Sequence, residues 1–401
     1  MAKTKPNAFS TRAVHTGERT PGAEFTPVST PIQMSVGYLY ESMDEVDAIF
    51  AGTKSGYVYP RYGSPTVSSF EEVIADLENG EAAHAFATGM AALHVALLAA
   101  GVRAGAHVVA AFDLYGATFS LLRNLFTTLG AEIHFVDAAD LDGVASAVRA
   151  YKPVALLVET VSNPLVKVAD LERLGQIAAA NGVRFLVDNT FASPLLVNPI
   201  DFGADFVIHS ATKYIGGHGD LMAGIVVSSN ENRLKMYELN KLVGSTLGPF
   251  EAWLALRGVK TLPLRVKQQC QNAAQIADWL SAHPKVAKVN YPGLAGHPQH
   301  ALAERMFGER GFGGMLSFEI KGADQPAAFR FMERLKLCLP ATTLGDIYSL
   351  VLHPATSSHR ALTAAERVQI GIPDGLIRLS AGIEAGEDII ADLAQAFEAV
   401  G

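Results

Sequence analysis

Short apolar runs separated by turn residues recur between residues 63 and 256. The runs HVVAAF, EIHFVD, VALLVET, RFLVDN, DFVIHS and GIVVSS have the length and composition of buried strands. Helical patterns lie between several of them. In DLERLGQIAAANGV, Asp170 is the expected cap and Gly182 the expected end. This alternation of strands and helices predicts an α/β domain with a mostly parallel sheet.

The pattern changes on both sides of this region. Residues 1–62 are rich in Gly, Pro, Ser and Thr, which is the composition of an unusually long loop. Beyond residue 256, stretches such as NAAQIADWLSAH, GGMLSFEI and LIRLSAGI mix helical and strand patterns. We therefore predict an N-terminal arm (1–62), an α/β domain (63–256) and a smaller C-terminal α+β domain (257–401).

Composition narrows the classes of protein. The chain has 401 residues, of which 49% are hydrophobic and 18% charged, so it can bury a full core. Its net charge of −8 argues against nucleic acid or an anionic membrane as partner. Its apolar runs are too short to span a bilayer, and Cys270 and Cys338 match no metal or disulfide pattern. We expect a soluble cytoplasmic protein.

Polar residues follow several predicted strands at the edge where ligands bind in such sheets. They are Glu159, Asn163, Asp188, Ser210, Thr212, Lys213, Asp113 and Tyr115. In FATGMAALH, Gly89 opens a helix near Met90, whose backbone N–H groups are suited to bind an anion, and Arg61 could add a charge. An ordinary strand-to-helix turn is the alternative. The fingerprints GxGxxG and GxxxxGK[ST] are absent, which disfavours a nicotinamide or ATP enzyme.

Lys213 is a lone cation beside strands that are expected to be buried. Burial lowers the pKa of a lysine and makes the neutral amine available as a nucleophile or base. Asp188 ends an apolar strand, where it is either a helix cap, a solvated loop carboxylate or a buried group that needs a cationic partner. A reactive lysine, a carboxylate, an aromatic ring and a phosphate site together are what pyridoxal phosphate requires.

The motifs that carry these residues resemble, in order, those of the Cys/Met metabolism family of pyridoxal-phosphate enzymes. They are YPRYGSPT, ATGMAA, LYGATF, ETVSNP, VDNTFASP, SATKYIGGHGD, YPGL and HPATSSH. The family includes cystathionine γ-synthase, cystathionine γ-lyase, methionine γ-lyase and the O-acylhomoserine sulfhydrylases. The resemblance implies a fold-type-I transferase domain with a seven-stranded type of sheet. It also implies a homotetramer of tight dimers, with active sites shared between subunits and an amino acid as substrate.

The resemblance also implies a role for each matching residue. Lys213 would bind the cofactor's aldehyde, Asp188 would pair with its ring nitrogen, and Tyr115 would stack on the ring and move protons. Arg378, with Thr343 near it, would bind the substrate carboxylate, and Asn163 would bond that carboxylate or the cofactor's phenolic oxygen. The phosphate would be held by Gly89, Met90, Ser210, Thr212 and, from the neighbouring subunit, Tyr59 and Arg61.

Departures from the family pattern bear on the substrate. Members that handle cystathionine usually carry an arginine soon after Tyr-Gly and a glutamate before Ser-Leu-Gly, where this chain has Phe119, Ser120 and Thr342. The segment GGHGDLMAGIVV resembles the corresponding motif of methionine γ-lyases, although Ala117 stands where those enzymes typically have a cysteine. We therefore favour γ-elimination on a sulfur amino acid. Alternatives are γ-replacement on O-acetyl- or O-succinylhomoserine and, more remotely, a non-catalytic cofactor-binding module.

Two histidine pairs invite a metal-site interpretation, His297 with His300 and His353 with His359. No cluster of carboxylates or cysteines accompanies them, so capping and loop roles are expected instead. We predict no metal site.

Overall fold

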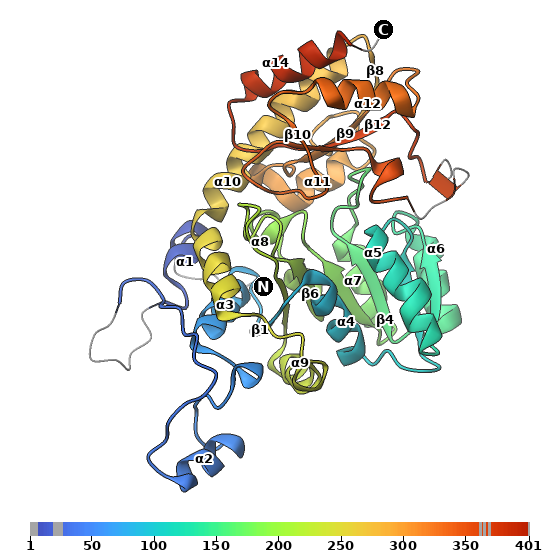
Figure 1. Cartoon of the computed structure of the whole chain (residues 1–401). Coiled ribbons are helices and arrows are strands. Elements are labelled where there is room, and N and C mark those ends of the chain that lie inside the picture. The colour runs from blue at the N-terminus through green and yellow to red at the C-terminus, as the bar shows by residue number, and fades with distance from the viewer. Residues whose placement is uncertain (1–6, 19–26, 361–362, 364–365, 368–369, 400–401) are drawn as a thin grey trace.

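Most of the chain folds around two β-sheets that are joined by one long helix (Figure 1). The computed structural model describes residues 7–18, 27–360, 363, 366–367 and 370–399. Residues 1–6 and 19–26 of the predicted arm lie outside the described residues. So do 361–362, 364–365, 368–369 and 400–401 of the predicted C-terminal domain.

Within the described residues, the large sheet has seven strands in the order β1-β7-β6-β5-β4-β2-β3. Their bounds are β1 (Ala82–Phe86), β2 (His107–Ala111), β3 (Glu132–Val136), β4 (Ala155–Glu159), β5 (Arg184–Asp188), β6 (Phe206–Ser210) and β7 (Gly224–Ser228). Strands β2 to β6 pair in parallel, whereas β7 runs antiparallel to β6 and β1. The predicted strands and the mostly parallel sheet are confirmed. Strand β1 was missed because AAHAF lacks the β-branched residues that favour strands.

Helices connect and pack against these strands. They are α3 (Pro65–Leu77), α4 (Gly89–Ala99), α5 (Gly116–Ser120), α6 (Leu141–Tyr151), α7 (Leu171–Ala180), α8 (Ser193–Leu196) and α9 (Asn230–Val243), with the π-helix η2 (Leu121–Phe126) and the 3-10 helix η3 (Pro199–Phe202). Helix α7 confirms its predicted ends. The side chain of Asp170 accepts the Arg173 N–H at 3.1 Å, and Gly182 follows the helix with a φ of 66°.

The second sheet has the order β10-β11-β12-β9-β8. Its elements are β8 (Val286–Asn290), α11 (His300–Phe307), η4 (Gly308–Arg310), β9 (Met315–Ile320), α12 (Gln325–Arg334), β10 (Leu339–Pro340), β11 (Leu350–Leu352), η5 (Pro354–Thr356), β12 (Leu376–Ser380) and α14 (Gly386–Phe397). Among the described helices, none is both long and apolar enough to cross a membrane.

Helix α10 (Pro249–Ala282) runs along both sheet domains (Figure 1). Its apolar side chains as far as Cys270 pack in the core of the large sheet, and those from Ala273 onward pack in the second core. The sequence-based boundary between residues 256 and 257 therefore falls inside this helix. The predicted division into arm, cofactor domain and C-terminal domain stays a prediction.

The N-terminal arm contains α1 (Phe9–His15), α2 (Met43–Phe50) and η1 (Pro60–Tyr62); α1 lies against α3 and α10, whereas the segment with α2 extends away from the large sheet domain (Figure 1). This region was predicted to be loop, and helices α1 and α2 were not predicted. The Ser42 hydroxyl accepts the Glu45 N–H at 3.2 Å, and the Glu45 carboxylate accepts the Glu41 N–H at 3.0 Å. This S-x-x-E spacing is the signature of a helix start, so the signal was present.

Candidate active site

A cavity of about 270 Å³ lies at the carboxyl ends of β4, β5 and β6, against the C-terminal domain. It brings together the predicted site residues Gly89, Met90, Tyr115, Asn163, Asp188, Ser210, Thr212, Lys213 and Arg378. These residues come from segments far apart in sequence. The carboxyl edge of the sheet collects them, as expected for an open α/β sheet.

Lys213 lies in the turn that follows β6, and it is half-buried at the cavity. Its Nζ donates a hydrogen bond to the hydroxyl of Thr343 at 2.9 Å, which brings Thr343 to the site. Burial lowers the pKa of Lys213. The Asp346 carboxylate opposes this shift and the Arg378 guanidinium adds to it. The lowered pKa increases the share of neutral amine, which is the nucleophilic and basic form.

A buried and a partly buried carboxyl group face the cavity from neighbouring strands. Asp188 ends β5, Glu159 ends β4, and the two residues pair across the sheet. Burial raises the pKa of Asp188, whereas hydrogen bonds from Thr190 and the nearby His209 ring lower it. The pKa of Glu159 is raised well above its usual value by burial and by Asp188. A cation placed against Asp188 would favour its ionised form.

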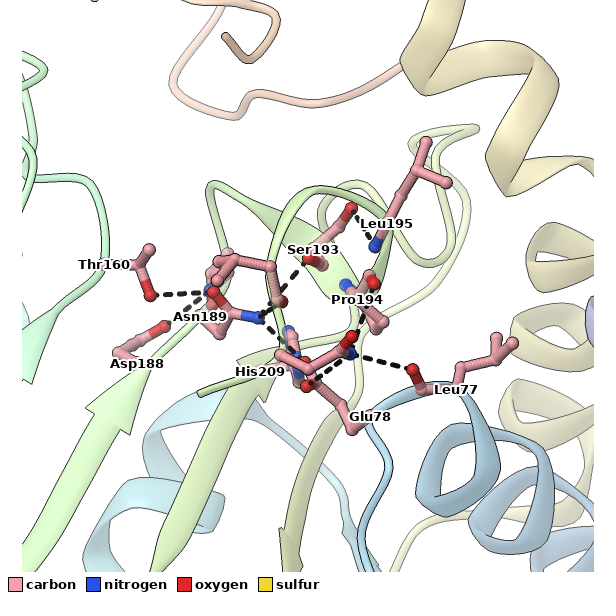
Figure 2. Close-up of polar contacts among 12 residues, drawn as sticks. Leu77, Glu78, Thr160, Asp188, Asn189, Ser193, Pro194, Leu195 and His209 are labelled. Atoms are coloured by element: carbon pink, nitrogen blue, oxygen red, sulfur yellow. Dashed lines mark hydrogen bonds and ion pairs between the residues drawn. The ribbon is translucent and has the colours of Figure 1, made fainter. Parts of the chain in front are cut away.

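Next to Asp188, a buried polar network joins β5, β6 and the end of α3 (Figure 2). His209 Nε2 lies 2.6 Å from Glu78 Oε1, and both side chains are almost completely buried. Asn189 Nδ2 donates to Glu78 Oε1 at 2.8 Å, and Asn198 Nδ2 donates to Glu78 Oε2 at 3.1 Å. The Glu78 carboxylate therefore holds together the two strand ends that carry Asp188 and the Lys213 turn.

Arg378 enters the cavity from β12 of the C-terminal domain. Its Nη1 donates to Asn163 Oδ1 at 3.2 Å, and its Nη2 donates to the carbonyl of Thr343 at 3.0 Å. Its Nε is buried without a partner among the described residues. Burial lowers the pKa of Arg378 to about 10, so it stays a cation at neutral pH. An unpaired buried N–H of a cation favours an anionic ligand such as a carboxylate.

The N-terminus of α4 faces the same cavity. The Thr88 hydroxyl caps the helix by accepting the Ala91 N–H at 3.0 Å. A Cβ added to Gly89 would meet the Cβ of Ser210 at 2.8 Å, so only glycine permits this close approach. The Thr212 hydroxyl accepts the Ala223 N–H at 3.0 Å and lines the cavity. Backbone N–H groups and hydroxyls at a helix start are suited to hold a phosphate.

Tyr115 lines the cavity with 45% of its surface exposed, and its N–H donates to Glu159 at 2.6 Å. By contrast, Tyr59 and Arg61 do not reach the cavity of their own chain. Arg61 Nη1 donates to the carbonyl of Lys241 at 2.8 Å, and its guanidinium lies 5.5 Å from the Tyr59 ring centroid. Their expected contact with the phosphate site of a neighbouring subunit stays a prediction.

Histidines of the two predicted pairs form hydrogen bonds with atoms of nearby loops. His300 Nδ1 lies 2.8 Å from the Pro292 carbonyl, and His353 Nε2 lies 2.7 Å from the Asp374 carbonyl. His297 Nδ1 accepts the Gln299 N–H at 3.2 Å. These contacts match the loop and capping roles expected of them.

The cavity fits pyridoxal phosphate in its donor set. One space is surrounded by Lys213, whose pKa is lowered, by Asp188, whose ionised form a cation would favour, and by the helix N-terminus at Gly89. The free Nε of Arg378 leaves a site for the carboxylate of an amino acid beside them.

Comparison with known proteins decides the family. A model of the Cys/Met metabolism PLP-dependent enzymes matches residues 10–398. The chain belongs to this family. It is therefore a pyridoxal-phosphate-dependent enzyme of sulfur amino-acid metabolism with the fold-type-I architecture, a lyase or a γ-synthase.

Relatives of this enzyme have several activities. It is 41% identical to the L-methionine gamma-lyase of Fusobacterium nucleatum subsp. polymorphum, over 99% of this chain and 100% of that protein. It is also 41% identical to the cystathionine beta-lyase of Lactococcus lactis subsp. cremoris, over 98% of this chain and 99% of that protein. The solved cystathionine gamma synthase of Xanthomonas oryzae pv. oryzae superposes with a TM-score of 0.92 at 38% identity, covering 99% of both chains. Family membership alone thus leaves the exact reaction open.

The buried pair that supports the enzyme's site from behind was not predicted from the sequence. Glu78 and His209 were not named, although a histidine inside the apolar run DFVIHS and a glutamate at the end of α3 were visible. The two residues are 131 positions apart in the sequence, so only the fold brings them together. Polar residues inside an otherwise buried strand were the available signal.

We expect Glu78→Ala to lower the free energy of unfolding by about 3–5 kcal/mol, because it leaves His209, Asn189 and Asn198 without their shared acceptor. Glu78→Gln keeps one acceptor oxygen and the volume, so its loss is smaller. Urea unfolding at fixed protein concentration measures both. Glu231→Ala, which removes an exposed pair with Lys235 at 2.7 Å, is the control and leaves the midpoint unchanged. A wild-type midpoint for Glu78→Ala would contradict this account.

Proposed function

We propose that this enzyme catalyses γ-elimination on methionine or a closely similar sulfur amino acid. The products are 2-oxobutyrate, ammonia and a thiol. The proposal is supported by the chemistry of the cavity wall and by 41% identity to an L-methionine gamma-lyase over nearly the whole chain.

The observation that carries the proposal is the neutral wall around the expected position of the γ-substituent. In the described part of one subunit, the cations lining the cavity are Lys213 and Arg378, both already assigned to cofactor and carboxylate. The rest of the wall includes the side chains of Val161, Phe191, Met222, Thr342 and Leu344. A methyl thioether suits this surface. The charged distal head group of cystathionine would lose its hydration there without an ionic partner.

The residues assigned to the cofactor keep the roles implied by the family. Lys213 would hold the aldehyde carbon, Asp188 the ring nitrogen, and Tyr115 the ring face. Ser210 and Thr212 would hold the phosphate with the backbone at Gly89 and Met90. Asn163 and Arg378, whose side chains are already hydrogen-bonded to each other, would bind the substrate carboxylate beside Thr343.

The chain's own groups then move the protons of the reaction. Pyridoxal phosphate, when bound, withdraws electrons from the substrate's α-carbon. The neutral amine of Lys213 removes the α-proton and then helps to move a proton of the β-carbon. The Tyr115 hydroxyl, exposed to the cavity, donates a proton to the departing sulfur. Arg378 fixes the carboxylate so that the α-proton faces Lys213.

The alternative is γ-replacement on O-acetyl- or O-succinylhomoserine, in which the same groups would act and a sulfur nucleophile would take the place of the departing carboxylate at the γ-carbon. The similarity to the Xanthomonas cystathionine gamma synthase favours keeping it as the second candidate. The two reactions differ in what occupies the neutral end of the cavity after the γ-substituent leaves.

We also propose that the enzyme is a homotetramer of dimers, with Tyr59 and Arg61 reaching the partner subunit's phosphate site. Support comes from the arm, where large apolar side chains are exposed in one chain. They are Val28, Met34, Val36, Leu39, Met43 and Phe50. Such a concentration of exposed apolar surface favours burial against another chain. A cytoplasmic location is proposed because Cys270 and Cys338 are buried free thiols.

Incubation with single substrates tests the reaction. We expect the enzyme to form 2-oxobutyrate and methanethiol from methionine alone. With cystathionine, the expected turnover is much weaker. Homocysteine formed only from an O-acylhomoserine plus sulfide would instead establish γ-replacement, and pyruvate from cystathionine as the main product would establish β-elimination.

Thr342→Glu is the matched variant for this assay, because it places a carboxylate at the neutral end of the cavity. We expect it to lower turnover of methionine and to raise the ratio of cystathionine to methionine turnover, since the carboxylate can pair with the distal amino group. An unchanged ratio would show that Thr342 does not contact the γ-substituent.

Arg61→Ala is expected to weaken cofactor binding by roughly 10- to 100-fold, the loss of one or two charge-assisted hydrogen bonds to phosphate. Dialysis followed by visible absorbance measures retention. Arg233→Ala, in the same hollow as Arg61, is the control and retains the cofactor. Co-expression with Lys213→Ala subunits should restore one complete site in each hybrid dimer. Wild-type retention by Arg61→Ala in an assembled oligomer would refute the shared site.

A further inference from the structure

A second group of side chains with ligand chemistry lies at the other edge of the large sheet. His107 begins β2, Glu132 begins β3, and His134 follows Glu132 by two positions. The strands are parallel neighbours with His107 opposite Glu132 and Val109 opposite His134. Alternate residues of a strand share one face, so Glu132 and His134 project to the same side. This edge is remote from the carboxyl ends that carry the cavity.

The ligand atoms of the three residues converge. His107 Nδ1 lies 3.0 Å from His134 Nε2 and 3.5 Å from Glu132 Oε2. All three ligand atoms lie within 4.8 Å of one another. A zinc ion binds histidine nitrogen and carboxylate oxygen at about 2.0–2.2 Å, which separates neighbouring ligand atoms by about 3.0–3.5 Å. The His107–His134 and His107–Glu132 distances already have this spacing.

The histidine rings are held in place before any ion binds. The Tyr151 ring, at the end of α6, stacks on His134 with a centroid distance of 3.5 Å and an interplanar angle of 7°. The rings of His107 and His134 are also stacked, at 5.2 Å and 23°. Fixed ring planes on adjacent strands reduce the entropy that metal binding must overcome.

The protonation state of His134 also suits a metal ligand. Burial lowers the pKa of His134, the neighbouring His107 lowers it further, and Glu132 opposes the shift. A neutral imidazole is the form that binds a metal. Glu132 is exposed, so the open side of the cluster faces solvent, where water could complete the coordination.

We propose that His107, Glu132 and His134 bind a divalent transition-metal ion of the zinc class, separately from the pyridoxal-phosphate site. Two imidazoles with one carboxylate favour such an ion over magnesium or calcium, which prefer oxygen ligands. The ion would link the edge strand β3 to β2. The predicted absence of metal rested on histidines adjacent in sequence, whereas this cluster is assembled by strand pairing.

Equilibrium dialysis of the cofactor-loaded enzyme, first stripped of metal with a chelator, against zinc chloride tests the site. We expect one zinc ion per chain and a zinc-dependent rise in the midpoint of thermal unfolding. Cobalt(II) should show the visible absorption of a low-coordinate nitrogen and oxygen site. The double variant His107→Gln/His134→Gln should lose zinc binding, and Glu132→Gln should weaken it by at least about 10-fold.

The double variant His297→Gln/His300→Gln is the matched control and should bind zinc as the wild type does. All variants should keep the visible absorbance of bound cofactor, because the cluster lies at the opposite edge of the sheet. The proposal is overturned if the enzyme binds no zinc, or if His107→Gln/His134→Gln and Glu132→Gln bind it like wild type. The cluster would then be a hydrogen-bonded imidazole pair only. Should the double variant fail to fold, Glu132→Gln, which changes an exposed side chain, still decides.

Discussion

Burial of charged side chains at the carboxyl edge of the large sheet is the constraint on which the site depends. Asp188 and Glu159 end neighbouring buried strands, while the half-buried Lys213 and the buried Arg378 lie close by. Burial pushes the pKa of each toward the value that favours its neutral form. These four side chains lack partners of complementary chemistry, namely an aldehyde, a pyridinium nitrogen and two anionic groups. The family's cofactor and an amino-acid substrate would supply them together.

Two layers of structure keep these groups in position. Behind the site, Glu78 receives hydrogen bonds from both strand ends, so the charged edge rests on a buried network (Figure 2). In front of it, the C-terminal domain contributes Arg378 and Thr343, which contact Asn163 and Lys213. Because α10 packs in both cores, the two domains hold one cavity between them.

Much of the sheet and the charged part of the site could be predicted from the sequence. Buried parallel strands are continuous apolar runs, and their polar ends mark the ligand edge, which is how Lys213 and Asp188 were found. Strand β1 could not be read from AAHAF, since its pairing with β7 rather than its composition makes it a strand. The Glu78–His209 pair and the His107, Glu132 and His134 cluster depend on contacts between distant segments. The local pattern of apolar and polar residues does not indicate which distant segments come into contact.

Lys213 is the residue proposed to bind the cofactor, and one measurement tests this directly. The purified enzyme is loaded with pyridoxal phosphate, reduced with borohydride, digested and mapped by mass spectrometry. We predict that the reduced cofactor is found on the peptide that contains Lys213, in near-stoichiometric yield, and that Lys213→Ala carries none there. Modification of a different lysine at that yield, with Lys213 unmodified, would contradict the account.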